Sequence, residues 1–343
     1  MSDAVVLAGA AVKGAFAAGA LSVLSEPDTR ARIGVDVRRI VGASSGALNG
    51  AYYAAALHAG AEDGVGARLA QLWLDDATLA GSFDVSLRDL AAGLGLSSEK
   101  KIFTLLRDQI TPSPPGAARA ARPVELRIVV TNLDGEPAEI DGEPATTYEH
   151  LFVAGGADFE SADSLERVFT AVAASAAVPG AFAPVRMARD GAGTFAAQDG
   201  GIVNDSPLGH ALAPGLDVDR VFVIVPFPRV RDDVADLRGL SMALHLLDVL
   251  VEERLFRDLR HAARVNRALG RLADAVPDTG QRSAVLDALG WGGRRVATIV
   301  EIRPAVSLTG NAFSGFVSRD LRERYVQAGA DAARAALATL PAR

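Results

Sequence analysis

Cysteine is absent from this chain of 343 residues. The protein therefore forms no disulfide, binds no metal through thiolate and uses no thiol nucleophile, which fits a cytoplasmic protein. Lysine is almost as rare, since only three of the 35 basic residues are lysine, and the formal net charge is −7. Phosphate binding requires clustered cations, so this charge balance argues against nucleic acid as the main partner.

Long unbroken apolar segments are also missing. Asp3 stands where a signal peptide carries basic residues, and Lys13 splits the N-terminal apolar run, so we do not expect secretion. The longest other uncharged stretch, residues 168–185, has the length of a membrane span but contains Pro179 and Pro184. We interpret it as protein interior and expect a cytoplasmic protein, with peripheral membrane contact left open.

The chain is 49% hydrophobic and 22% charged, so it can bury a large core. Short apolar runs rich in β-branched residues alternate with helical segments, which predicts an α/β fold of three layers with a mainly parallel central sheet flanked by helices. The expected strands are residues 5–8, 39–42, 125–131, 220–225 and 296–302. The expected helices begin after Gly14, Ser45, Ser164 and Leu240, and the last spans about residues 315–340.

We expect one domain over residues 1–343. Residues 61–122 contain no strong strand pattern and end in a Pro/Gly-rich stretch, which predicts a helical insertion followed by a loop. A helical C-terminal region is expected from about residue 240. Either helical region could form a lid or an interface, although apolar helices more often belong to the core. The oligomeric state is not readable from these patterns.

The strongest local motif is Gly42-Ala-Ser-Ser-Gly46, which follows the apolar run ending at Val41 and precedes a helical segment. A nucleophilic serine needs this context, because a sharp turn lifts its Oγ from the sheet edge and the flanking glycines relieve crowding. Ser44 is the central residue and our candidate nucleophile. The alternative is a Gly/Ser turn that only caps a helix.

A serine hydroxyl requires a neighbouring base. The five histidines are His58, His150, His210, His245 and His261, and none lies in a glycine-rich turn that would deliver a catalytic side chain. Asp199 is the more suggestive candidate, because Gly200 and Gly201 allow the backbone to turn directly after its carboxylate. An ordinary Asp-Gly turn is the alternative.

A third element is the loop Gly9-Ala-Ala-Val-Lys-Gly14 between a strand and a helix. Such a loop can direct backbone N–H groups at an oxyanion, and the candidate donors are Gly9, Ala10 and Ala11. It does not fit a phosphate-binding loop, because Lys13 precedes Gly14 and is not followed by serine or threonine, and the middle glycine of a dinucleotide fingerprint is absent. We therefore expect no cofactor and no metal.

These three elements, in this order, resemble the patatin-like phospholipase family. Its oxyanion-loop motif is matched by Gly9, Lys13 and Gly14, its Gly-x-Ser-x-Gly by Gly42, Ser44 and Gly46, and its Asp-Gly-Gly by Asp199, Gly200 and Gly201. Residues 173–185 and 201–207 are similar to further segments of the family. The resemblance implies a Ser44–Asp199 dyad that hydrolyses lipid esters, either phospholipid or neutral lipid, through an acyl-enzyme.

The chain departs from that family at Ala10 and Ala11, where the family has glycines. An alanine at a positive φ costs on the order of 1 kcal/mol or more, so the oxyanion hole is expected to be reshaped if either residue adopts that conformation. Two other functions stay open. One is an acyltransferase that uses the same serine, and the other is a catalytically weakened lipid-binding protein.

Overall fold

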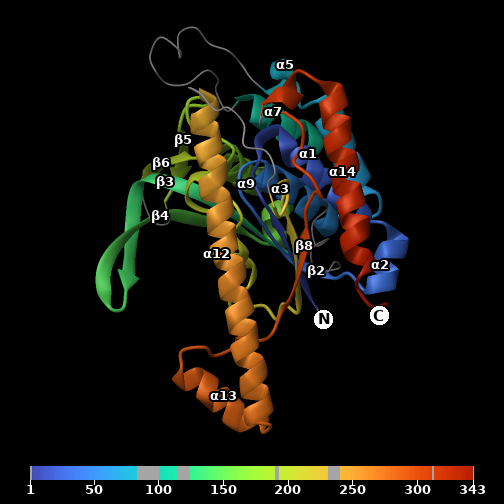
Figure 1. The fold of residues 1–343 in the computed structure, drawn as a ribbon. Helices are drawn as coiled ribbons and strands as arrows, with labels where there is room; N and C mark the ends of the chain where they lie inside the picture. Colours follow the sequence, from blue (N-terminus) through green and yellow to red (C-terminus); the bar gives the residue numbers. More distant parts are fainter. Residues whose placement is uncertain are drawn as a thin grey trace.

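The computed structural model describes residues 2–82, 100–113, 124–189, 193–230, 240–310 and 313–342. Within these residues eight strands form one sheet (Figure 1). The strands are β1 (Asp3–Leu7), β2 (Val37–Gly42), β3 (Glu125–Ile140), β4 (Glu143–Ala154), β5 (Val185–Ala188), β6 (Thr194–Gln198), β7 (Arg220–Ile224) and β8 (Thr298–Ile302).

The strand order is β5-β6-β3-β2-β1-β7-β8, with β4 paired to β3. The pairs β1–β2, β1–β7, β2–β3 and β7–β8 are parallel, whereas β3–β4, β3–β6 and β5–β6 are antiparallel. All five expected strands are present, and the mainly parallel sheet is confirmed. The sequence prediction missed β4, β5 and β6, which have exposed or half-exposed residues along much of their length and therefore no continuous apolar run.

Helices cover both faces of the sheet. The α-helices are α1 (Gly14–Leu24), α2 (Pro27–Ile33), α3 (Ser45–His58), α4 (Val65–Asp75), α5 (Leu79–Ser82), α7 (Lys100–Gln109), α9 (Ala162–Ser175), α10 (Gly201–Asn204), α11 (Leu208–Ala211), α12 (Leu240–Ala275), α13 (Thr279–Ala288) and α14 (Arg319–Ala338). The 3-10 helices are η1 (Ala11–Lys13), η2 (Gly156–Phe159) and η3 (Ser314–Phe316). Figure 1 shows α12 running across one face, with α13 at its far end, and α1 beside α14 at the other side.

Alternate residues of the central strands enter two separate cores. In β1, Val5 and Leu7 join the core beneath helices α1, α3 and α9, whereas Ala4 and Val6 join the core beneath α11 and α12. All four side chains are fully buried. Burial on both faces is the reason that the central strands are continuous apolar runs in the sequence.

Several predicted boundaries shift because capping residues decide them. Helix α9 begins at Ala162, and the Ser161 side chain accepts a hydrogen bond from Ser164 N–H at 3.1 Å. Helix α14 begins at Arg319 after the capping Ser318, so residues 314–316 form a separate 3-10 turn.

The expected insertion contains α4, α5 and α7 where it is described, and residues 83–99 and 114–123 lie outside the described residues. Residues 168–185 form the end of α9 and a turn. Most of their apolar side chains are buried, whereas Pro179 and Pro184 are exposed. Among the described helices, none combines the length and apolar character needed to cross a bilayer.

Candidate active site

Ser44 occupies the tight turn between β2 and α3. Its backbone has φ 52° and ψ −127°, a conformation that costs a non-glycine residue on the order of 1–3 kcal/mol. A Cβ added to Gly42 would lie 2.5 Å from Gly46 O, and one added to Gly46 would lie 2.1 Å from Leu7 O. The two glycines of the motif are therefore required by close backbone approaches on either side of a strained serine.

Asp199 lies in the turn between β6 and α10, and its carboxylate reaches Ser44. The Ser44 Oγ donates a hydrogen bond to Asp199 Oδ2 at 2.7 Å, and Gly201 N–H donates to Oδ1 at 2.7 Å. A Cβ on Gly200 would lie 2.0 Å from Val129 O. The structure thus brings together the serine and the aspartate from positions 155 residues apart in the chain.

Burial controls the acidity of Asp199. Removal from water raises the pKa of its carboxyl from 3.8 to about 6, although hydrogen bonds from Ser44 and Gly201 act in the opposite direction. The carboxylate is therefore ionised at neutral pH, yet it is a stronger base than an exposed aspartate. This combination suits a group that must accept a proton near neutral pH.

The loop after β1 lies against this pair, but its amides differ in their surroundings. The Gly9 N–H donates to Asp205 O at 3.4 Å, and the Ala10 N–H donates to Ser45 Oγ at 3.0 Å. Ala11 has φ 47° and lines the cleft in front of Ser44. Of the three candidate oxyanion donors, Gly9 and Ala10 thus already have acceptors within the protein.

Close packing also explains the remaining loop residues. A Cβ on Gly9 would lie 2.7 Å from Ser44 Cβ, and one on Gly14 would lie 2.8 Å from both Ser45 Oγ and the Trp73 ring. Lys13 ends the 3-10 turn η1, and its N–H donates to Ala10 O at 3.0 Å. The loop is therefore pressed directly against the Ser44 turn.

Ser44 opens into a mainly apolar cleft. The other lining residues are Ala11, Ser45, Leu48, Leu72, Trp73, Ala77, Gly81, Ser82, Lys101, Ile102, Leu105, Ala176, Val178, Phe182, Phe313 and Phe316. Trp73 is held by its indole N–H, which donates to Asn49 Oδ1 at 2.6 Å, while Asn49 Nδ2 donates to Gly14 O at 2.9 Å. The sequence prediction missed both residues, although one of only two tryptophans is a natural candidate for a cleft wall.

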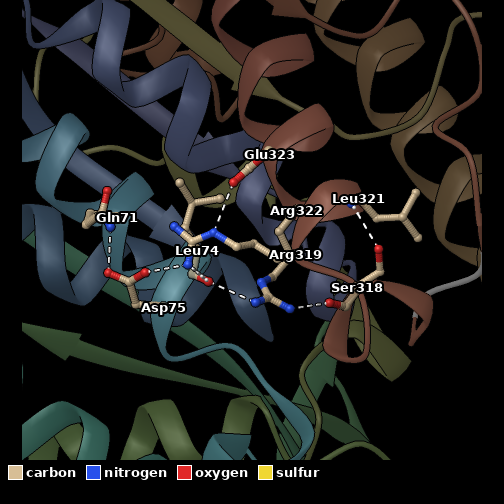
Figure 2. Close-up of polar contacts among 9 residues, drawn as sticks. Gln71, Leu74, Asp75, Ser318, Arg319, Leu321, Arg322 and Glu323 are labelled. Atoms are coloured by element: carbon tan, nitrogen blue, oxygen red, sulfur yellow. Dashed lines mark hydrogen bonds and ion pairs between the residues drawn. The ribbon is translucent and has the colours of Figure 1, made fainter.

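A buried arginine joins two walls of this cleft. Arg322 of α14 donates from Nη2 to Leu74 O at 2.8 Å and from Nη1 to Gly315 O at 2.6 Å, and Figure 2 shows its side chain extending from α14 toward Leu74 at the end of α4. Leu74 follows the lining residue Trp73, and Gly315 precedes the lining residue Phe316. One guanidinium therefore ties together segments that are far apart in the sequence.

Next to Arg322, an exposed ion-pair network surrounds Arg319 (Figure 2). Arg319 Nη1 lies 2.8 Å from Asp75 Oδ1, and its Nε lies 3.0 Å from Glu323 Oε1. Gln71 Nε2 donates to the second oxygen of Asp75 at 2.5 Å. These contacts connect the end of α4 to the start of α14 at the surface.

The described histidine side chains lie away from Ser44. His58 stacks on Phe159, with ring centroids 4.7 Å apart, and burial lowers its pKa. His150 and His210 contact Glu136 and Glu149 respectively. His261 is exposed on α12, and the side chain of His245 lies outside the described residues.

Within the described residues, no three histidine, aspartate or glutamate side chains lie close enough together to hold a metal ion.

Comparison with known proteins places the chain in a family. The sequence model of the patatin-like phospholipase family matches residues 5–212, more than half of the chain, so the protein belongs to that family. Membership supports lipid acyl hydrolase activity in general. The crystal structure of VipD from Legionella pneumophila is similar at 14% identity and a TM-score of 0.42, covering 99% of this chain and 67% of that one. A search of curated proteins returned no match.

Proposed function

We propose that this protein is a lipid acyl hydrolase in which Ser44 attacks a carboxylic ester and Asp199 is its base. The observation that carries the proposal is the 2.7 Å hydrogen bond from Ser44 Oγ to Asp199 Oδ2, made beside an apolar cleft. A serine hydroxyl becomes a competent nucleophile when a positioned base accepts its proton. The raised pKa of Asp199 supports that role.

The reaction proceeds in two halves. Asp199 takes the hydroxyl proton while Ser44 Oγ attacks the ester carbonyl, and this proton then leaves with the alcohol as the acyl-enzyme forms. Water next loses a proton to Asp199 and attacks the acyl carbonyl. The fatty acid departs, and the proton returns to Ser44. One carboxylate thus acts as base and acid in both halves.

The negative charge that develops on the carbonyl oxygen of the ester requires hydrogen-bond donors in front of Ser44. We assign this role to the Ala11 N–H, because Ala11 lines the cleft whereas the Gly9 and Ala10 amides have internal acceptors. Helix α3 begins at Ser45, and its N-terminal dipole favours negative charge at the same place. The substitution of glycine by alanine at position 11 keeps the donor.

The composition of the cleft supports a proposal for the substrate class. Its walls are mainly aliphatic and aromatic, which suits an acyl chain, whereas Lys101 is its one charged residue within the described chain. We propose a long-chain lipid ester, either phospholipid or neutral lipid. Contact with a lipid surface would involve Val317, which is 70% exposed and follows the lining residue Phe316.

The test is labelling with a fluorophosphonate probe together with hydrolysis of a short ester. We expect the parent to be labelled and active, and Ser44→Ala to lose both properties. Asp199→Asn should lose most of both, on the order of 10³-fold or more in rate, because no base remains. Ser22→Ala is the matched control, since it removes a half-buried serine that bonds Gly19 O in α1 far from the dyad.

Folding of each variant is checked by circular dichroism. A folded Ser44→Ala protein that still hydrolyses the ester at the parent rate would refute the proposal. Product analysis in the presence of an alcohol separates the two fates of the acyl-enzyme. Free fatty acid alone supports hydrolysis, whereas a new ester as the main product would assign the protein as an acyltransferase.

A further inference from the structure

We propose that Ser175 is a positioning residue that sets the geometry between Ser44 and Asp199. It lies at the C-terminal end of α9 and is fully buried. Its hydroxyl accepts a hydrogen bond from Ser44 N–H at 2.9 Å and donates one to Val129 O at 2.6 Å. This role rests on the function proposed above and explains how that site is held.

The backbone of Ser44 creates the need for such a partner. With φ at 52°, Ser44 leaves the strand conformation of β2, and its N–H is buried. An unpaired buried amide costs as much as a lost hydrogen bond. The Ser175 hydroxyl satisfies this amide, and its own bond to β3 fixes the direction in which it accepts.

Ser175 also holds the aspartate side of the pair. Its carbonyl accepts a hydrogen bond from Gly200 N–H at 3.1 Å, directly after Asp199. Thr131, two residues beyond Val129 on β3, donates from Oγ1 to Asp199 O at 2.7 Å. The Ser44 turn is therefore linked to β3 through the Ser175 hydroxyl, and Asp199 is linked to β3 through Thr131. Ser175 contacts both Ser44 and Gly200.

The Ser175 hydroxyl is enclosed by protein. Ser175 is fully buried and is absent from the residues that line the cleft, whereas its neighbour Ala176 is one of them. Loss of the hydroxyl should therefore misalign the reacting groups without removing a contact to the acyl chain. A small misplacement of reacting groups can lower the rate on the order of 100-fold, even when the mutated residue does not touch the substrate.

The decisive variants are Ser175→Ala and Ser175→Thr, measured on a short ester. We expect Ser175→Ala to lower kcat on the order of 10- to 100-fold with KM changed less than about twofold, and Ser175→Thr to recover part of kcat because the hydroxyl returns. The acid limb of the pH profile should also move to higher pH in Ser175→Ala. The bond from Ser44 lowers the pKa of Asp199, so its loosening raises that pKa.

Thr170→Val is the matched control. It removes a hydroxyl that donates to Glu166 O at 2.7 Å on the same helix, away from the pair. Its kcat and pH profile should equal those of the parent. If it lowers kcat as much as Ser175→Ala does, the effect belongs to α9 as a whole and the proposal is wrong.

If Ser175→Ala does not fold, Ser175→Cys carries the test, because it preserves volume while thiol is a weak donor and acceptor. A folded variant of either kind with parental kcat and pH profile overturns the role of Ser175. If the Ser44→Ala variant keeps the activity of the parent, the proposed function is wrong instead. The two failures are therefore distinguishable.

Discussion

Two polar networks, one around Ser44 and one around Arg319, lie close to residues that line the same cleft, and they differ in burial. In the Ser44 network, Ser44, Asp199 and Ser175 are at most 6% exposed. In the Arg319 network, the side chains of Arg319 and Asp75 are 51% and 47% exposed. Hydrogen-bond lengths overlap, at 2.6 to 2.9 Å around Ser44 and 2.5 to 3.0 Å in the ion-pair network around Arg319. Burial therefore decides what each bond contributes, because exposed ion pairs exchange easily with water and buried groups cannot.

Arg322 shows that the distinction follows burial and not position. It lies next to Arg319, but it is only 4% exposed, and its two carbonyl acceptors, Leu74 and Gly315, adjoin the lining residues Trp73 and Phe316. We therefore group it energetically with the Ser44 network. The following predictions test this comparison, from the largest expected effect to the smallest.

Gly46→Ala should have the largest effect. The new Cβ would lie 2.1 Å from Leu7 O and 2.7 Å from Leu7 C, and both atoms belong to the backbone of β1. We expect a loss of roughly 4 kcal/mol or more in the free energy of unfolding, measured with urea. Gly209→Ala is the control, since nothing lies within 4 Å of its Cβ, and an equal loss there would remove the steric explanation.

Arg322→Met should cost about 2–4 kcal/mol, because the Leu74 and Gly315 carbonyls lose their buried donor. The long-chain to short-chain activity ratio should also fall as the cleft walls separate. Arg319→Gln, in the exposed network beside it, should leave the urea midpoint unchanged. Equal effects from the two arginines would contradict the division by burial.

Asp199→Asn should inactivate the protein and stabilise it. The pKa of Asp199 rises from 3.8 to about 6 on folding, so the folded state disfavours the ionised carboxylate. This destabilisation is absent below pH 4, grows as pH rises through about 6 and reaches up to about 3 kcal/mol above it. Urea unfolding at pH 8 should show the gain, which should disappear at pH 4. A variant less stable than the parent at pH 8 would contradict the buried-charge cost.

Ionisation of Asp199 should raise the rate of ester hydrolysis, although it lowers the stability of the folded protein. Asp199 acts as base only when deprotonated, so kcat/KM for a short ester should fall about tenfold per pH unit below pH 6 and level off above it. Parallel unfolding measurements confirm that the protein stays folded over this range. A profile flat down to pH 4 would exclude Asp199 as the base.

Patterns that depend on neighbouring residues were readable from the sequence, and those that depend on distant contacts were not. Strands β1 and β7 are buried on both faces and β2 nearly so, and they appear as apolar runs, whereas β4 to β6 have exposed or half-exposed residues along much of their length and were missed. Arg322 looks like any surface arginine on an amphipathic helix. Its burial arises only when α14 packs against α4.

The candidate site shows the same division. Motif spacing and family resemblance selected Ser44 and Asp199, and the structure places them in contact. Residues 173–185 resemble a segment of the family, but nothing in this run of small residues distinguishes Ser175 from its neighbours. Its partner is an amide turned by the positive φ of Ser44, which no local signal in residues 173–185 encodes.

The smallest expected effects are in the loop of residues 9–14, where the backbone conformations of Ala10 and Ala11 differ. Ala11 has φ 47°, where alanine is strained and glycine is not, whereas Ala10 has φ −170°, which any residue adopts. Ala11→Gly should therefore stabilise the protein by up to about 1 kcal/mol, and Ala10→Gly should destabilise it by about 0.5–1 kcal/mol through the entropy of the unfolded chain. Thermal unfolding of both variants measures the difference. If the two substitutions shift the midpoint in the same direction, the strain is not at Ala11 and the loop geometry proposed for the oxyanion donor is wrong.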